Sequence, residues 1–442
     1  MTNVENNPVS AIESGPQSQL YLQQLGSRII GSRLVIGIVA LVVATCLGES
    51  FHDNWRQFLF GYLTAWCFFF CIASSALFFV LAHHLFKASW SVVLRRLAEA
   101  LSCNFVLLLV LFIPIALGLK ELYVWTDASF MGSDQELTNK IGYLNQNFFL
   151  IRMAVYFAIL IGISIYYYHV SYMQDRNGGV DRILALRKQS GWCFLVVIWV
   201  MNLVGADLVM SLQPKWLSYA APLLFFSGAV MTIYAVLTLM SMWLQRNGRL
   251  QNAVTVEHYH DLGKWLFAWM TFWAYICIAQ YLLIWYGNVP DETRFFLFRD
   301  LGPWGIISIA LLAGHFLIPF LGLMSRHVKR NKAALAFWCV WLLFFGYLDM
   351  FWQIQPGFWV NTPGLIDWIS GQNPYHLMTN APLQMQQLLW APLSVKAIVM
   401  DILCIVGIGG LFFSHSFYLL RDKPLLPVKD PHLSESLAFE NI

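Results

Sequence analysis

The sequence predicts an all-α polytopic membrane protein with about ten transmembrane helices and both ends in the cytoplasm. Of the 442 residues, 58% are hydrophobic and only 12% are charged, whereas a soluble domain carries about 25% charged residues. Apolar runs of helical length recur along the chain, each about 20 residues long, which is enough to cross a hydrocarbon core. Because a backbone in hydrocarbon must satisfy its own hydrogen bonds, each run is expected to be a helix. The third observation is the alternation of positive charge between the runs.

Ten apolar runs, separated by breakers and charged segments, are the predicted spans. They cover residues 29–47, 58–81, 97–117, 148–170, 191–212, 219–244, 265–286, 304–324, 333–354 and 393–418. The short alternating segments of a transmembrane β-barrel do not occur between them. The spans place one membrane domain at residues 26–420.

Positive charge fixes the predicted orientation. Of the 27 Lys and Arg residues, 19 lie in the two tails, in the even-numbered connections or at the start of the first span (Arg33). Six lie in the opposite connections, and two lie deeper inside spans. Since Lys and Arg accumulate on the cytoplasmic side, both termini are expected in the cytoplasm. The tail at 1–25 lacks the apolar core of a signal peptide. It and the tail at 421–442 are expected to be disordered or peripheral.

Two longer connections, 120–147 and 355–392, are expected on the outer face. Both are rich in aromatic residues, Gly and Pro and carry few charges. They could lie along the membrane interface, anchored by Trp and Tyr, or form a docking surface for outer partners, because loops of this length are often functional. The sequence leaves both interpretations open.

An internal repeat links the fifth and ninth spans. Both contain the pattern W-x7-D-x5-Q-P, with Asp207 in the fifth span and Asp349 in the ninth. Four spans separate the two copies, so both copies cross the membrane in the same direction. The pattern predicts a parallel repeat in which spans two to five (58–212) are echoed by spans six to nine (219–354), with the first and tenth spans as additions.

Ionisable side chains inside the spans are the first candidates for function. Each costs about 2.5–3.5 kcal/mol in a membrane helix on insertion scales, so it needs a partner or a role. Carboxylates and imidazoles at successive depths are what proton transfer through a bundle requires. The alternative is structural: helix ends, hydrogen bonds across the bundle, a buried histidine or an interfacial position. The proton-path candidates are Asp207, His315, Asp349, Asp401, Glu99 and His169.

A second group could hydrogen-bond a quinone head near the outer third of the membrane. It consists of Gln280, Arg152 and Asp207. Arg152 is equally expected to act as the ion-pair partner of one of the buried carboxylates. No catalytic residue is assigned in this chain.

Cofactor motifs are absent from the sequence. The eight cysteines lie in apolar runs without a CxxC, no span carries a haem-binding pair of histidines, and there is no P-loop, HExxH or GxSxG motif. We therefore expect no metal and no hydrolytic site in this chain, with quinol as the one ligand left open. The net charge of +3 gives no indication of nucleic acid binding.

Four segments resemble a known family. GADLVMSLQPKW (205–216), AQYLLIWYGNVPDET (279–293), HFLIPFLGLMSRHVKRN (315–331) and GYLDMFWQIQP (346–356) are similar to the NrfD/PsrC-like membrane subunits. They are most similar to the second, smaller such subunit of alternative complex III, a bacterial quinol:cytochrome c oxidoreductase. The chain departs from the usual family pattern at Leu208, where Trp is common, and at Lys215, where His is common.

The resemblance implies two four-helix bundles, helices 2–5 and 6–9, with two flanking helices, in the bacterial inner membrane. It also implies partners: a larger NrfD-like membrane subunit, a periplasmic iron–sulfur subunit and c-type cytochrome subunits. Electrons would pass from quinol through iron–sulfur clusters and haem c, all in the partners, to cytochrome c or directly to a terminal oxidase. The role implied for this chain is assembly and a transmembrane proton path.

Two other functions remain as alternatives. The first is the quinone-binding anchor of another molybdoenzyme-like reductase. The second is a proton-coupled transporter. Against the transporter, neither repeat is expected to carry the Gly- or Pro-broken helix that such substrate sites usually need.

Overall fold

The computed structural model describes residues 20–49, 54–178, 180–300, 303–359 and 390–441. Within these ranges every regular element is a helix. Ten of the helical segments found there are long and apolar enough to cross a membrane. This number confirms the predicted one, and each predicted span agrees with an observed segment to within two residues or falls inside it. The chain is therefore a multi-pass helical protein.

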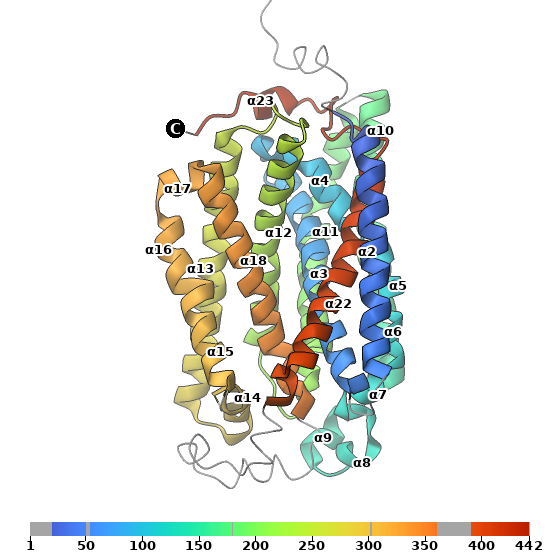
Figure 1. The fold of residues 1–442 in the computed structure, drawn as a ribbon, viewed down its shortest axis with the longest axis vertical. Helices are drawn as coiled ribbons and strands as arrows, with labels where there is room; N and C mark the ends of the chain where they lie inside the picture. Colours follow the sequence, from blue (N-terminus) through green and yellow to red (C-terminus); the bar gives the residue numbers. More distant parts are fainter. Residues whose placement is uncertain (1–19, 50–53, 179, 301–302, 360–389, 442) are drawn as a thin grey trace, which may run out of the picture.

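The spans run along the long axis of the molecule (Figure 1). Six of them are single helices: α2 (Gln23–Glu49), α3 (Asn54–Leu85), α10 (Gln146–Asn177), α12 (Ala220–Arg246), α13 (Val256–Gly287) and α22 (Val395–Leu420). The fifth is α11 (Asp181–Leu208), which is followed by a 3-10 turn, η4 (Met210–Leu212). The ninth is α18 (Lys332–Ile354), which continues into a 3-10 turn, η6 (Gln355–Trp359). The third is divided into α4 (Val92–Ser102), α5 (Phe105–Leu111) and α6 (Ile113–Leu117), and the eighth into α15 (Pro303–Leu311), η5 (Leu312–Leu317) and α16 (Ile318–Met324).

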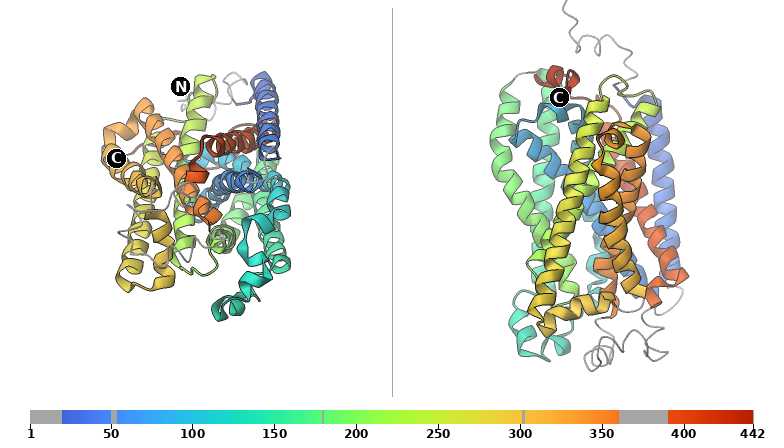
Figure 2. Two further views of the ribbon diagram at one scale, coloured as in Figure 1. Left: turned by 60° about the horizontal axis from the view of Figure 1, so that its bottom comes forward. Right: turned by 90° about the vertical axis from the view of Figure 1, so that its left-hand side faces the viewer.

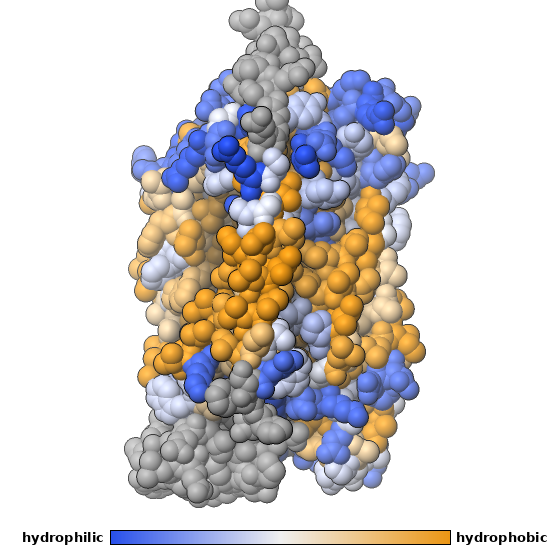
Figure 3. All heavy atoms as spheres, turned by 45° about the vertical axis from the view of Figure 1, so that its right-hand side comes forward, coloured by the Kyte–Doolittle hydropathy of each residue, from blue (hydrophilic) through white to orange (hydrophobic). Residues whose placement is uncertain are grey.

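Both described ends of the chain lie at the same end of the molecule. The backbone N–H of Leu425 donates to the carbonyl of Leu20 at 2.8 Å. We call this the terminal end and the opposite one the far end. On the face seen in Figure 3, a hydrophobic band separates hydrophilic residues at the two ends, as expected for a protein that spans a bilayer.

Helix α3 forms the centre of the molecule. Every residue from 57 to 84 is buried, and the helix packs against α4, α11, α12, α18 and α22 at the centre of the bundle (Figure 2). A helix that is hydrophobic on all sides is expected in such a position. Helix α2 is peripheral and packs on α22, where a Cβ added to Gly410 would lie 2.8 Å from the Cα of Gly37. Small residues thus let these two backbones approach closely.

The eighth span contains a helical irregularity that the sequence-based expectation missed. Segment η5 is a π-helical turn that contains Gly314 and ends two residues before Pro319. Proline cannot donate a hydrogen bond to the carbonyl one turn earlier, and the widened turn lets Trp341 Nε1 donate to the carbonyl of Gly314 at 2.7 Å. The helix stays continuous through this turn, because the flanking residues Leu311 and Ile318 are both in the right-handed helical region. The irregular turns of the third and eighth spans do not occupy corresponding positions in the two predicted repeats.

The predicted outer loop at 120–147 is a folded helical segment at the far end. It contains α7 (Leu119–Leu122), η3 (Val124–Thr126), α8 (Ala128–Met131) and α9 (Gln135–Lys140). Lys140 donates to the carbonyl of Pro214 at 2.9 Å, and Lys215 pairs with Asp134 at 3.1 Å. These contacts fasten the segment to the end of the fifth span. Helix α14 (Pro290–Asp300) lies at the same end, and most of 355–392 lies outside the described residues.

The segment after Arg421 is packed across the terminal end. Arg95 of α4 pairs with Asp430, and Ser436 in helix α23 (Leu433–Leu437) donates to the carbonyl of Trp90 at 2.8 Å. Lys264 of α13 donates to Asn441 at 2.9 Å. Of the two expectations for this tail, peripheral and disordered, the described part is peripheral and ordered. The expected tail at 1–25 falls largely outside the described residues.

The Arg95–Asp430 pair should hold this tail in place. Burial alone would raise the pKa of Asp430, but the Arg95 guanidinium lowers the pKa below its ordinary value. Replacing Asp430 by Asn leaves Arg95 short of a buried partner, at a cost of about 3 kcal/mol, so limited proteolysis should cut the tail much faster. In the control, Asp422→Asn should change nothing, because the Asp422 carboxylate is exposed.

The pH dependence has a defined sign. A carboxylate with a lowered pKa in the folded protein contributes stability above its unfolded pKa of about 3.9, and this stability is lost as the pH falls further. The tail should therefore resist protease from neutral pH down to about pH 4 and become sensitive below it. Equal sensitivity of the wild type and Asp430→Asn at pH 7 would contradict this account.

Candidate functional site

Asp207 of the first repeat is locked in an ion pair. Arg152 of α10 donates from Nε and Nη2 to the two carboxylate oxygens, each at 2.9 Å, and Tyr156 donates to Oδ2 at 3.0 Å. Arg152 also donates to the carbonyl of Tyr143 at 2.8 Å. The expectation that Arg152 pairs with a buried carboxylate is confirmed. A bidentate pair of this kind fixes the geometry of both side chains.

Asp349, the matching residue of the second repeat, has no such cation. Trp273 Nε1 and Gln353 Nε2 donate to its Oδ2 at 3.1 and 2.9 Å, while Oδ1 has no hydrogen-bond partner among the described residues. The Trp273 ring stacks on His315 with centroids 3.9 Å apart, and His315 Nε2 lies 3.3 Å from Met231 Sδ. Asp349 and His315 are therefore joined through one tryptophan. The two aspartates of the shared sequence pattern therefore have different surroundings.

A cavity of about 520 Å³ borders Asp349. This is within the usual range of small-molecule sites, about 300–1,000 Å³. Its lining comes from α13, α14, α15, η5 and α18, and it is mostly apolar. The side chains of Ile278, Tyr281, Ile309 and Leu312 line it and are also exposed on the surface. The cavity therefore reaches from a buried carboxylate to the face of the molecule that would contact lipid.

Asp401 on α22 is the second buried carboxylate without a cation. Its side chain is 4% exposed, and neither oxygen has a hydrogen-bond partner in the described part of the chain. It lies against Gly61 of α3, where an added Cβ would be 2.1 Å from Oδ1. Tyr347 of α18, whose hydroxyl also lacks a described partner, is within electrostatic range of Asp401. Gly61 thus provides the space that this carboxylate occupies.

Replacing Gly61 by Ala should destabilise the protein. The new methyl group would overlap Asp401, and overpacking of this kind costs about 1–3 kcal/mol. Unfolding in detergent measures the loss. Gly162→Ala is the control, because no atom lies within 4 Å of its added Cβ. Adding Asp401→Ala to Gly61→Ala should restore most of the stability; an unchanged double variant would show that the Asp401 carboxylate is not what the methyl group displaces.

Glu99 and His169 lie away from these groups. Glu99 is within 3.5 Å of Arg95 and 3.4 Å of Arg96, and Arg96 also binds Asp175 at 2.6 Å. Glu99 is therefore held in a network of charges at the terminal end. His169 is exposed on the outer side of α10, so it does not face the interior of the bundle.

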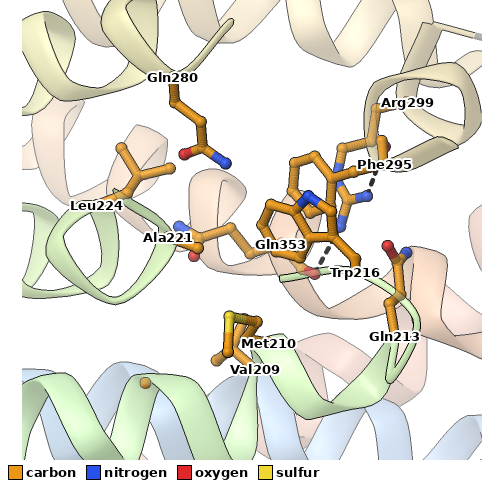
Figure 4. A pocket seen from close by; sticks show the side chains of 11 residues that line it. Val209, Met210, Gln213, Trp216, Ala221, Leu224, Gln280, Phe295, Arg299 and Gln353 are labelled. Atoms are coloured by element: carbon orange, nitrogen blue, oxygen red, sulfur yellow. Dashed lines mark hydrogen bonds between the residues drawn. The ribbon is translucent and has the colours of Figure 1, made fainter. Parts of the chain in front are cut away.

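Gln280 lines a different and much smaller cavity at the far end. This cavity measures about 10 Å³, the space of about one water molecule. Gln280 points into it, together with Trp216 and Gln353 (Figure 4), and Gln280 Nε2 has no partner among the described residues. Neither Arg152 nor Asp207 lines this cavity. The structure therefore does not bring together the three residues expected to bind a quinone head.

Sequence reasoning missed two residues of this region. Trp273 lies seven positions before Gln280, a spacing that places the two residues on one helix face. This spacing in the sequence could have identified Trp273 as a candidate. Arg299 was counted with the outer loops but is 1% exposed. It donates to the carbonyls of Trp352 and Gln353 at 3.1 and 2.9 Å, at the end of α18. No periodicity in the sequence indicates that contact.

The comparisons with known proteins add no assignment. No protein-family model matches the chain, and no curated protein matches it. The geometry is thus the main guide to what the site can do. In the described ranges, no three His, Cys, Asp or Glu side chains gather closely enough to hold a metal ion. The arrangement instead offers two unneutralised buried carboxylates, a stacked imidazole and one cavity open toward lipid.

Proposed function

We propose that this chain is an integral membrane subunit of a respiratory quinol:cytochrome c oxidoreductase of the alternative complex III type. The observation that carries the proposal is the pair of repeated aspartates, both buried near the far ends of α11 and α18. Arg152 forms an ion pair with Asp207, whereas Asp349 has no ion pair among the described residues. The resemblance of four segments to the NrfD/PsrC-like subunits supports it. So does the observed number of spans.

The packing of the helices supports two bundles of four. In the first repeat α3 packs on α4 and α11, and α10 packs on both α4 and α11. In the second repeat α12 packs on α13 and α18, while α13 packs on α16 and α18 on α15. Helices α2 and α22 pair with each other beside α3. The proposal places the terminal end in the bacterial cytoplasm, in agreement with the distribution of Lys and Arg.

Within the proposed complex, Asp349 in the second repeat and Asp401 on the tenth span handle protons, and the first repeat is structural. Asp349, His315 and Asp401 are buried and have no ion-pair partner among the described residues, whereas Asp207 and Glu99 are held by arginines. A group that relays protons must be able to gain and lose one, and a strong ion pair opposes this. Asp349 and Asp401 are therefore the proposed carriers, with His315 beside Asp349.

The proposed partners are a larger NrfD-like membrane subunit, a periplasmic iron–sulfur subunit and c-type cytochromes. The experiment is purification through a tag on this chain from its native membrane, followed by mass spectrometry of the subunits. We expect multihaem cytochrome c and iron–sulfur subunits in stoichiometric amounts. Isolation of the chain alone, with substrate uptake after reconstitution into liposomes, would instead identify a transporter.

A second candidate function is favoured by the cavity beside Asp349. An apolar cavity that reaches the lipid face and ends at a hydrogen-bond acceptor has the form of a quinone-head site, and this would make the chain a quinone-binding anchor. Photoaffinity labelling with an azidoquinone tests it. Labels on α13 and α15 would support binding here, whereas labels confined to a partner subunit would assign quinol to the partner.

A further inference from the structure

A groove of about 420 Å³ lies at the terminal end between α12 and α18, which pack side by side (Figure 1). Its size falls within the range of ligand sites, about 300–1,000 Å³. The lining residues are Met242, Gln245, Arg246, Gln251, Lys332 and Ala333. None of the six is acidic, so the groove has two cationic side chains, two amides and two apolar side chains.

The position of the two cations along the helices indicates a membrane boundary. Arg246 is the last residue of one candidate span, and Lys332 is the first residue of another. Both side chains are therefore expected at the depth of lipid headgroups, and both are exposed. Met242, one turn before Arg246, lies where an acyl chain would begin. A ligand with an anionic head and an apolar tail matches this order of polar and apolar groups.

The contacts of the groove leave its cations available. Lys332 Nζ donates to Gln245 Oε1 at 2.9 Å and lies 5.1 Å from the centre of the Tyr259 ring. These neutral partners hold its position without cancelling its charge. No ion pair to Arg246 occurs in the described part of the chain, and the nearby carboxylate of Glu257 is already paired with Arg330. Among the described residues, nothing thus neutralises the positive charge of the groove.

From these observations we propose that the groove binds one anionic phospholipid, with the phosphate between Arg246 and Lys332 and the acyl chains along the exposed face of α18, where Phe337 and Val340 are 55% and 57% exposed. A lipid is favoured over a free anion because the site sits at the ends of two spans and continues into apolar surface. The proposal is independent of the redox role proposed above. It holds for any function of a chain with this topology.

The test uses the full chain purified in a non-ionic detergent, with phosphatidylglycerol as the probe and native mass spectrometry as the readout. Phosphatidylcholine and inorganic phosphate are the comparison ligands. We expect the chain to retain phosphatidylglycerol in clear preference to phosphatidylcholine. Inorganic phosphate alone should not bind in the groove. If the wild-type chain showed no preference for phosphatidylglycerol over phosphatidylcholine, the proposal would be overturned. This comparison requires no variant.

A matched pair of variants locates the lipid. Arg246→Gln with Lys332→Gln should weaken phosphatidylglycerol binding about thirtyfold, or about fivefold for each basic side chain near the surface. Arg176→Gln with Lys188→Gln removes the same charge from exposed positions at the same end and should leave binding unchanged. If both pairs weakened phosphatidylglycerol binding equally, the lipid would be attracted only to a generally positive face of the protein. If inorganic phosphate bound as well as phosphatidylglycerol, the groove would be a site for anions and not for lipid. Either result would overturn the proposal.

Discussion

Replacing Asp349 by Asn is expected to lower proton movement through the assembled complex by at least about tenfold, while its haems remain reducible. Asn has the same shape, and its amide oxygen can still accept from Trp273 and Gln353, which now donate to Asp349 at 3.1 and 2.9 Å. The change therefore removes the exchangeable proton with little change in packing. Loss of a positioned acid–base group typically costs a factor of about 10²–10⁴ in the step it serves.

The measurement is proton release per electron in proteoliposomes that contain the whole complex. Asp181→Asn serves as the control, because Asp181 is an exposed carboxylate at the start of α11. Thermal unfolding of both variants shows that the fold is retained. Unchanged proton release in Asp349→Asn would assign this aspartate a structural role and remove the second repeat from the proposed path.

Replacing Arg152 by Gln should destabilise the protein by about 3–5 kcal/mol. The substitution leaves Asp207 buried and charged without its bidentate partner, and breaking one side of a buried ion pair typically costs this amount. Unfolding of the purified chain in detergent measures the loss. The control is Arg176→Gln, which changes an exposed arginine of the same helix.

A double variant separates the pair from the rest of α10. Arg152→Gln combined with Asp207→Asn removes both charges and should recover most of the lost stability, because no charge then remains buried without a partner. If the double variant were as unstable as Arg152→Gln alone, the loss would come from the contacts of Arg152 with Tyr143 and its neighbours. Proton release in the double variant should remain normal.

The sequence predicted the spans well because hydropathy is a local property. A run such as 148–170 must be a helix wherever it lies in the membrane, and its observed helix, α10, only extends further at both ends. Arg152 was also identified as an ion-pair partner, but several carboxylates were available. The choice of Asp207 depends on how α10 and α11 pack, and sequence spacing does not determine that.

The differences between the two repeats could not be predicted for the same reason. Asp207 and Asp349 occupy the same place in their motifs, yet only the structure places an arginine at one and a cavity at the other. Likewise, the space for Asp401 comes from Gly61, which is 340 positions away in the chain. The tail after Arg421 looked like a polar extension, and its ordered docking depends on Arg95.

The most direct test of the proposed role is quinol-driven reduction of cytochrome c by material purified through a tag on this chain. We predict c-type haem absorbance in that material and cytochrome c reduction on addition of quinol. Both should disappear together when the tag is placed on an unrelated membrane protein of the same cells. A preparation that contains this chain in pure form, without haem and without quinol oxidation, would contradict the account.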